Sequence, residues 1–264
     1  AEQFPWEIQV RSFLLLLALV LPFIWQLRDR LADEKRSALV YWGAAFCIPI
    51  SVANVLFGGD NLPAAFCFSA LFATIYAAGT LLSTYSSAPL RNPLRLIGGA
   101  GIALVALVLT YREASEEMGR RWIEHMGEPA VWGCGFAGLL LALPAVHLAV
   151  QAVRKAAWSD MLFSAAPLVT AFGYLLSESA WPVIFLLFNA YLLILGLEML
   201  LRGLREGSAF RTNFGMVMLV PLFIARWFDF DMTFIGRGIA FIVIGVGILM
   251  INMRFLRASK GDLQ

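Results

Sequence analysis

Charged residues are scarce in this chain of 264 residues. They make up 14% of it, whereas hydrophobic residues make up 60%. A soluble globular domain is about 25% charged and about 45–50% apolar. The shortage of charge therefore excludes a disordered chain, a nucleic-acid-binding protein and an ordinary cytosolic enzyme, and it favours a polytopic membrane protein.

Cysteine and histidine are also rare, with three and two residues. Cys47, Cys67 and Cys134 lie in or at apolar runs, and an odd number without paired spacing argues against a disulfide framework or a zinc site. His125 and His147 are expected at different depths, which argues against a haem held by two histidines. We therefore predict no metal site and no cofactor, and we interpret the cysteines as small packing residues.

Long apolar runs separated by short polar breaks fill the chain. A spanning helix needs about 20 mostly apolar residues, so the runs predict one integral membrane domain over residues 1–264. Its fold is expected to be all-α, a bundle of about nine transmembrane helices, or eight if one run fails to cross. The expected spans are residues 8–27, 37–57, 62–85, 94–111, 130–151, 161–177, 181–201, 213–228 and 232–253.

Some of these expected spans carry features that modify a simple helix. The first, sixth and eighth are marginal in length. Prolines within the spans predict kinks, since proline removes a backbone donor. These prolines are Pro22, Pro49, Pro144, Pro167 and Pro221.

Lysine and arginine are unevenly distributed over the expected connections. With nine spans, 14 basic residues fall on one side of the membrane and 6 on the other. The positive-inside rule places the richer side in the cytoplasm. The C-terminus is then cytoplasmic and the N-terminus lies outside.

One connection is long, residues 112–129. Met118, Trp122 and Met126 recur there every four residues among five glutamates and three arginines. This spacing predicts an amphipathic helix that lies on the outer membrane surface as a connector. A lid or a docking site for a partner is the alternative interpretation.

Small residues at four-residue spacing mark the faces on which helices approach closely in lipid. The third and fifth expected spans have such rows, the fourth opens with a run of small residues and the ninth contains several glycines, so these helices should be central or tightly paired. The residues are Ser69, Ala73 and Ala77 in the third span, residues 98–101 in the fourth, Cys134, Gly138 and Ala142 in the fifth, and Gly236, Gly238, Gly245 and Gly247 in the ninth.

Four polar residues within the spans are candidates for function, because an ionisable group at depth costs roughly 2.5–3.5 kcal/mol. Glu198 is open to two interpretations, a protonatable carboxylate facing a cavity or, as we favour, an ion pair with Arg202 at i+4. We interpret Asn54 and Asn189 as makers of interhelical hydrogen bonds. His147 is interpreted as a packing or hydrogen-bonding residue.

The densest polar feature follows the expected eighth span and contains Arg226, Asp229, Asp231 and Arg237. Asp231 is expected at the N-cap position of the ninth helix. Arg237 would lie about a turn and a half into that helix, where Asp229 and Asp231 are the nearest anions. We interpret the four residues as an ion-pair network that fixes a tight hairpin. The alternative is a site for a small anionic or polar ligand.

The same stretch carries a family resemblance. ARWFDFDMTFIGRG at residues 225–238, followed by an apolar helix and MRFLR at 253–257, resembles the C-terminal end of the DUF2157-like group of bacterial polytopic membrane proteins of unknown function. The resemblance covers about 35 residues. It implies a location in the bacterial inner membrane, and it implies no reaction.

No catalytic constellation is recognisable in the sequence. We therefore favour a non-catalytic membrane subunit or scaffold that binds a protein or lipid partner, with membrane lipids, another protein or a second copy as partners and no nucleic acid. A small-solute transporter or channel is the alternative, and it predicts that Asn54, His147, Asn189 and Glu198 line one cavity. An enzyme acting on lipid headgroups at the 226–237 hairpin is the third hypothesis.

Overall fold

The chain forms a bundle of helices. The computed structural model describes residues 42–43, 45–49, 64–82, 92–125, 127, 129–176 and 181–229, with scattered positions between 242 and 253. No strand occurs among these residues. The predicted all-α class is confirmed.

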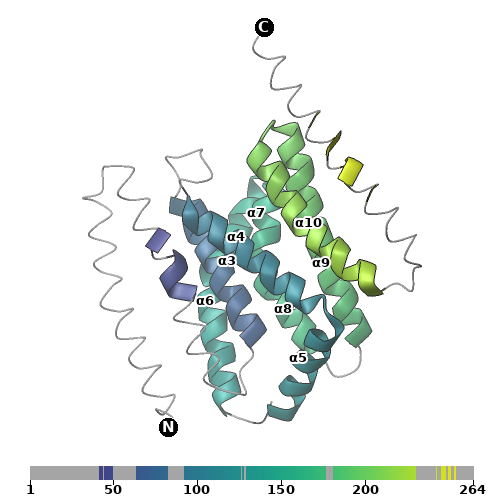
Figure 1. Ribbon diagram of the computed structural model, residues 1–264. Coiled ribbons are helices and arrows are strands. Elements are labelled where there is room, and N and C mark those ends of the chain that lie inside the picture. The colour runs from purple at the N-terminus through teal and green to yellow at the C-terminus, as the bar shows by residue number, and fades with distance from the viewer. Residues whose placement is uncertain are drawn as a thin grey trace.

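The helices are arranged in two groups (Figure 1). α3 and α6 lie on one side of the bundle and α9 and α10 on the other, α4 runs diagonally between them, and α5 and α7 lie toward opposite ends. Their bounds are α3 Ala64–Leu82, α4 Pro93–Leu109, α5 Arg112–His125, α6 Pro129–Arg154, α7 Trp158–Ser164, α8 Ala166–Leu175, α9 Trp181–Arg205 and α10 Ala209–Asp229.

Three helices are long and apolar enough to cross a membrane. They are α3 over Ala64–Leu81, α6 over Val131–Arg154 and α9 over Pro182–Arg205. A fourth candidate consists of Pro93–Leu109 of α4 together with Arg112–Met118 of α5, and these two segments are bent by 92°. The described residues therefore hold three to four candidate spans, and the predicted nine are not confirmed.

The sequence around Leu109 ends α4 and turns the chain. Asn92 caps the start of the helix, where its side chain accepts a hydrogen bond from the Arg95 amide at 3.2 Å. At the far end Thr110 and Tyr111 donate to carbonyls three residues earlier, and such bonds tighten the last turn of a helix. The charged residues that begin at position 112 then continue in a new direction as α5.

The expected sixth span is not one helix. It is divided into α7 and α8 at Ala165. Pro167 is the second residue of α8 and has no amide hydrogen for the Phe163 carbonyl, four residues earlier, so it interrupts the helical hydrogen bonds. The proline predicted a kink, and the structure has two helices separated by one residue.

The expected eighth span lies within α10, which is not among the candidate spans. Asn213, Arg226 and Asp229 lower its mean hydropathy, and Pro221 lies inside the helix. The first expected span lies outside the described residues, and only scattered positions of the second and ninth are described. The crossing of these three segments stays a prediction.

Glycine brings α3 and α4 into backbone contact. A Cβ atom on Gly98 would lie 2.5 Å from the Tyr76 amide nitrogen and 2.8 Å from the Phe72 carbonyl oxygen. Ala73 and Ala77 of α3 are fully buried. The row of small residues at 98–101 was predicted to mark a close helix contact, and this is confirmed.

A second small-residue contact joins α3 to α6. A Cβ atom on Gly138 would lie 2.6 Å from the Phe66 ring, and Ala142 is buried. Cys67 is buried beside Gly138, as expected for a packing residue, whereas Cys47 is exposed. The interpretation of the cysteines as small packing residues is therefore confirmed for Cys67 but not for Cys47, and the Cys134 side chain lies outside the described residues.

The expected amphipathic helix of the 112–129 connection is present as α5. Met118 is 7% exposed and lies 3.3 Å from the position that a Cβ atom on Gly173 of α8 would take. The opposite face carries ion pairs within the helix, such as Arg112 with Glu116 at 2.8 Å. Met118 therefore packs against protein, and the outer location of α5 stays a prediction.

The polar connections meet at two ends of the bundle. At one end Arg95 lies 2.7 Å from Asp160, and Arg202 of α9 donates to Ser159 of α7. At the other end Arg226 of α10 donates to the carbonyl of Thr110, which follows α4. This alternation agrees with the expected chain path. The cytoplasmic assignment of the first end stays a prediction.

Candidate functional site

The predicted hairpin cluster is described only at its beginning. The Arg226 guanidinium donates to the Thr110 carbonyl and lies over the Phe185 ring, 4.3 Å from its centre. It therefore fastens the end of α10 to α4 and α9. Asp229 is the last residue of α10, and its side chain lies outside the described residues, as do Asp231 and Arg237. The ion-pair network of the hairpin stays a prediction.

The predicted pairing of Glu198 with Arg202 is wrong. Arg202 Nε instead donates to Glu206 Oε1 at 2.7 Å, and its guanidinium also donates to Ser159 Oγ. Among the described residues, Glu198 forms no ion pair. Long basic side chains turn toward the polar end of a membrane helix, and Glu206 and Ser159 lie at that end.

Asn189 does not make the predicted interhelical hydrogen bond. Its Nδ2 donates to the Phe185 carbonyl at 2.6 Å within α9, and its buried Oδ1 has no hydrogen-bond partner among the residues that the structure describes. His147 is exposed on α6 and accepts from the Gln151 amide at 2.8 Å, as expected for a hydrogen-bonding residue. Asn54 lies outside the described residues.

A partly buried polar triad lies at the end of the bundle that holds α7. Tyr76 is 3% exposed, and its hydroxyl donates to Asp160 Oδ1 at 2.7 Å. Arg95 donates to the same carboxylate oxygen at 2.7 Å and to the Tyr76 hydroxyl at 3.2 Å. The three side chains thus join α3, α4 and α7.

A second polar group continues from this triad toward α9 and α10. Arg202 and Arg211 both pair with Glu206 in the turn between these helices. Burial and the neighbouring Arg202 guanidinium lower the pKa of Arg211. The first end of the bundle is therefore held by charge-assisted bonds from five helices, which are stronger than bonds between neutral groups.

The sequence analysis did not identify this triad. Arg95 and Asp160 each lie at the edge of an expected span, where a charged side chain is usually assumed to reach the membrane surface. Tyr76 lies inside an apolar run, where an aromatic residue is ordinary. A tyrosine about two turns from the end of an expected span, from where its hydroxyl can reach charged residues at that end, is the signal that could have identified the triad.

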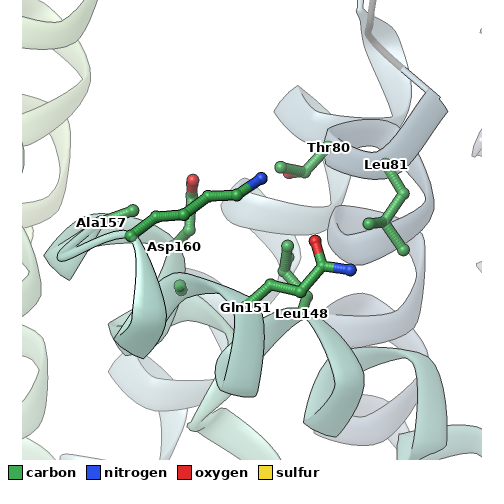
Figure 2. A pocket seen from close by; sticks show the side chains of 8 residues that line it. Thr80, Leu81, Leu148, Gln151, Ala157 and Asp160 are labelled. Atoms are coloured by element: carbon green, nitrogen blue, oxygen red, sulfur yellow. The ribbon is translucent and has the colours of Figure 1, made fainter.

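A small cavity with both polar and apolar lining residues adjoins the triad between α3, α6 and α7. It has a volume of about 230 Å³, and its polar lining residues are Thr80, Gln151, Lys155 and Asp160. Figure 2 shows Asp160 and Ala157 on one side of it, Thr80 and Leu81 on the other, and Gln151 and Leu148 on the helix below. Both hydrogen-bonding residues and residues of opposite charge therefore line one partly open cavity.

The turn from α6 to α7 positions Lys155 and holds a strained residue. Ala156 has φ +50°, and the Ala157 amide donates to the Ala152 carbonyl at 2.8 Å. This is the helix ending in which glycine is preferred, because glycine has no Cβ to clash in the left-handed region.

Replacing Ala156 with glycine should therefore stabilise the protein by about 0.5–1 kcal/mol. The measurement is the midpoint of thermal unfolding in detergent. Ala157→Gly is the matched control, since Ala157 has φ −87° and gains nothing from the change. An Ala156→Gly midpoint at or below that of the control would contradict this interpretation of the turn.

A larger groove lies between α9 and α10. It has a volume of about 910 Å³, and among its described lining residues Asn189 and Arg226 are the two that are not apolar. Leu186 and Leu193 of α9 and Phe223 of α10 line it and are 66%, 46% and 42% exposed. Gly245 also lies at its edge. His147 and Glu198 do not line this groove, so the predicted polar residues do not share it.

Comparison of the chain with known protein families, characterised proteins and solved structures found no match. The resemblance of the C-terminal segment to the DUF2157-like group therefore stays a prediction. Within the part of the chain that the structure describes, no group of three or more His, Cys, Asp or Glu side chains could hold a metal ion.

Proposed function

We propose that this protein is a non-catalytic subunit or scaffold of a bacterial inner membrane, and that a transmembrane helix of a protein partner binds between α9 and α10. The observation that supports the proposal is the chemistry of the groove there. Apart from Asn189 and Arg226 its described lining is apolar, and the Oδ1 atom of Asn189 is buried with no hydrogen-bond partner among the described residues.

The unpaired amide oxygen of Asn189 favours a helix over a lipid tail as the occupant of the groove. An unsatisfied polar group in hydrocarbon costs several kcal/mol, and an acyl chain has no donor to offer. A serine, threonine, asparagine or glutamine on a partner helix has one, and such bonds join helices in membranes. The exposed leucines around Asn189 supply the apolar contact that an arriving helix needs.

The transporter hypothesis receives less support from the same geometry. A transport path needs its polar groups to converge near the middle of the membrane. Asn189 lines the groove between α9 and α10, whereas His147 is exposed on α6 and bonds to Gln151. Glu198 lines neither the groove nor the cavity beside the triad.

Photocrosslinking in intact cells tests the proposal. A photoreactive amino acid at Leu193 in the groove should form an adduct with another membrane protein or with a second copy of the chain. The matched control is the same amino acid at Leu143 of α6, which is 60% exposed but lies outside the groove. Protein adducts at Leu193 and none at Leu143 are the expected result.

A second variant tests the role of the amide. Asn189→Leu should reduce the adduct at Leu193 about threefold or more, because it removes an interhelical hydrogen bond. Asn213→Leu is its control, since Asn213 is exposed on α10 and does not line the groove. Adducts at Leu193 with lipid alone, or equal adducts in both asparagine variants, would contradict the proposal.

A further inference from the structure

The cavity beside the triad is lined by two side chains of opposite charge that do not pair with each other in the described structure. These side chains are Lys155 and Asp160. Asp160 Oδ1 accepts the bonds from Tyr76 and Arg95. Its Oδ2 takes part in no hydrogen bond with any described residue, and the side chain is 16% exposed. Asp160 Oδ2 and the Lys155 ammonium group are therefore available to a molecule that enters the cavity.

The other lining groups add an acceptor and an apolar wall. The Gln151 amide nitrogen is engaged with His147 at 2.8 Å, which leaves its carbonyl oxygen to accept. Leu81 and Leu148 provide the apolar part of the lining. The cavity lining thus includes two acceptor-bearing residues, Asp160 and Gln151, and the ammonium-bearing Lys155. The cavity volume of about 230 Å³ is smaller than that of a typical drug-sized pocket, roughly 300–1,000 Å³.

The position of the cavity matches the headgroup layer of a membrane. Leu81 is the last residue of the candidate span in α3, and the candidate span in α6 ends at Arg154, next to Lys155. Headgroups occupy the region just outside the apolar core. A lipid in that layer could place its headgroup in the cavity and its chains against Leu81.

We propose that this cavity binds a primary ammonium group joined by a short linker to a phosphate, which is the chemistry of an ethanolamine phospholipid headgroup or of free phosphoethanolamine. The ammonium group donates to Asp160 Oδ2 and to the Gln151 carbonyl oxygen. The phosphate accepts from the Lys155 ammonium group. The site is separate from the groove of α9 and α10, so this proposal and the proposed function can fail independently.

Both charges of the ligand are needed by this arrangement. A phosphate alone would face the Asp160 carboxylate, and an amine alone would face the Lys155 ammonium group, with like-charge repulsion in each case. A quaternary ammonium group, as in choline lipids, has no N–H to donate. The cavity should therefore select an ethanolamine headgroup over both choline and glycerol headgroups.

The test is lipid binding to the full chain, measured by native mass spectrometry from detergent with synthetic lipids of identical acyl chains. Ethanolamine lipid should bind about tenfold more tightly than choline or glycerol lipid, since each lost charged hydrogen bond weakens binding by about that factor. Addition of free phosphoethanolamine distinguishes the two sources. If free phosphoethanolamine at the same concentration as the lipid displaces it, the ligand is the soluble molecule. If the lipid stays bound, the ligand is the membrane headgroup.

Two neighbouring cations provide the matched variants. Lys155→Gln should weaken ethanolamine lipid binding about tenfold. Arg154→Gln removes the same charge one residue away, from an exposed position outside the cavity, and should leave binding unchanged. Both residues are exposed, so neither change should prevent folding. Equal binding of the three lipids, or equal effects of the two variants, would overturn the proposal.

Discussion

Gly98→Ala should markedly destabilise the bundle, whereas Gly135→Ala should leave it intact or stabilise it slightly. The new Cβ atom at position 98 would lie 2.5 Å from a backbone nitrogen of α3. No side-chain rotation relieves a contact with backbone, so α3 and α4 must separate. Overpacking of this kind costs typically about 1–3 kcal/mol, and the cost here should be at the upper end.

The control substitution at Gly135 separates packing from helix propensity. Both glycines lie inside apolar helices, and a Cβ atom at position 135 would meet nothing within 4 Å. Alanine there should gain up to about 1 kcal/mol from helix propensity. Thermal unfolding in detergent, followed by circular dichroism, measures both variants. Equal midpoints would show that α3 and α4 do not pack through Gly98.

The close helix contacts could be predicted from the sequence because their cause is local. Glycine and alanine at regular spacing leave room for a neighbouring backbone wherever that neighbour comes from. The rows at Gly98 and Gly138 therefore identified contact faces before any partner was known. The identity of the partner, α3 in both cases, depends on the whole bundle and could not be predicted in this way.

Helix breaks were harder to predict than helix contacts. A hydropathy average treats residues 161–177 as one apolar run, but Pro167 withholds a hydrogen-bond donor and the helix divides at Ala165. The bend after α4 has a similar origin, since Thr110 and Tyr111 tighten its last turn beside a charged segment. Each of these effects acts through one or two residues, which an average over about 20 residues hides.

The polar triad could not be predicted because its members are distant in sequence. Tyr76 is 84 positions from Asp160, and Arg95 is 65 positions from it. Each residue alone has an ordinary explanation at a span end. For Glu198 the local i+4 rule suggested Arg202, whereas tertiary structure gave Arg202 other partners. Local rules failed where several charged residues competed for partners at one end of the bundle.

Asp160→Ala should destabilise the protein by about 2–3 kcal/mol, because it leaves the Arg95 guanidinium and the buried Tyr76 hydroxyl without their shared acceptor. Glu116→Ala is the control, since it removes one partner of an exposed pair on α5. Such pairs contribute about 0–1 kcal/mol. The midpoint of thermal unfolding in detergent should therefore be clearly lower for Asp160→Ala than for Glu116→Ala.

A double variant decides whether the loss at Asp160 arises from the unpaired arginine. Replacing Arg95 with methionine in the Asp160→Ala background removes the stranded charge and keeps an apolar side chain of similar length. Because removal of both partners of a buried pair costs less than removal of one, the double variant should be more stable than Asp160→Ala alone. If the two substitutions instead add their losses, Arg95 contributes to stability through packing against α3 rather than through its bond to Asp160.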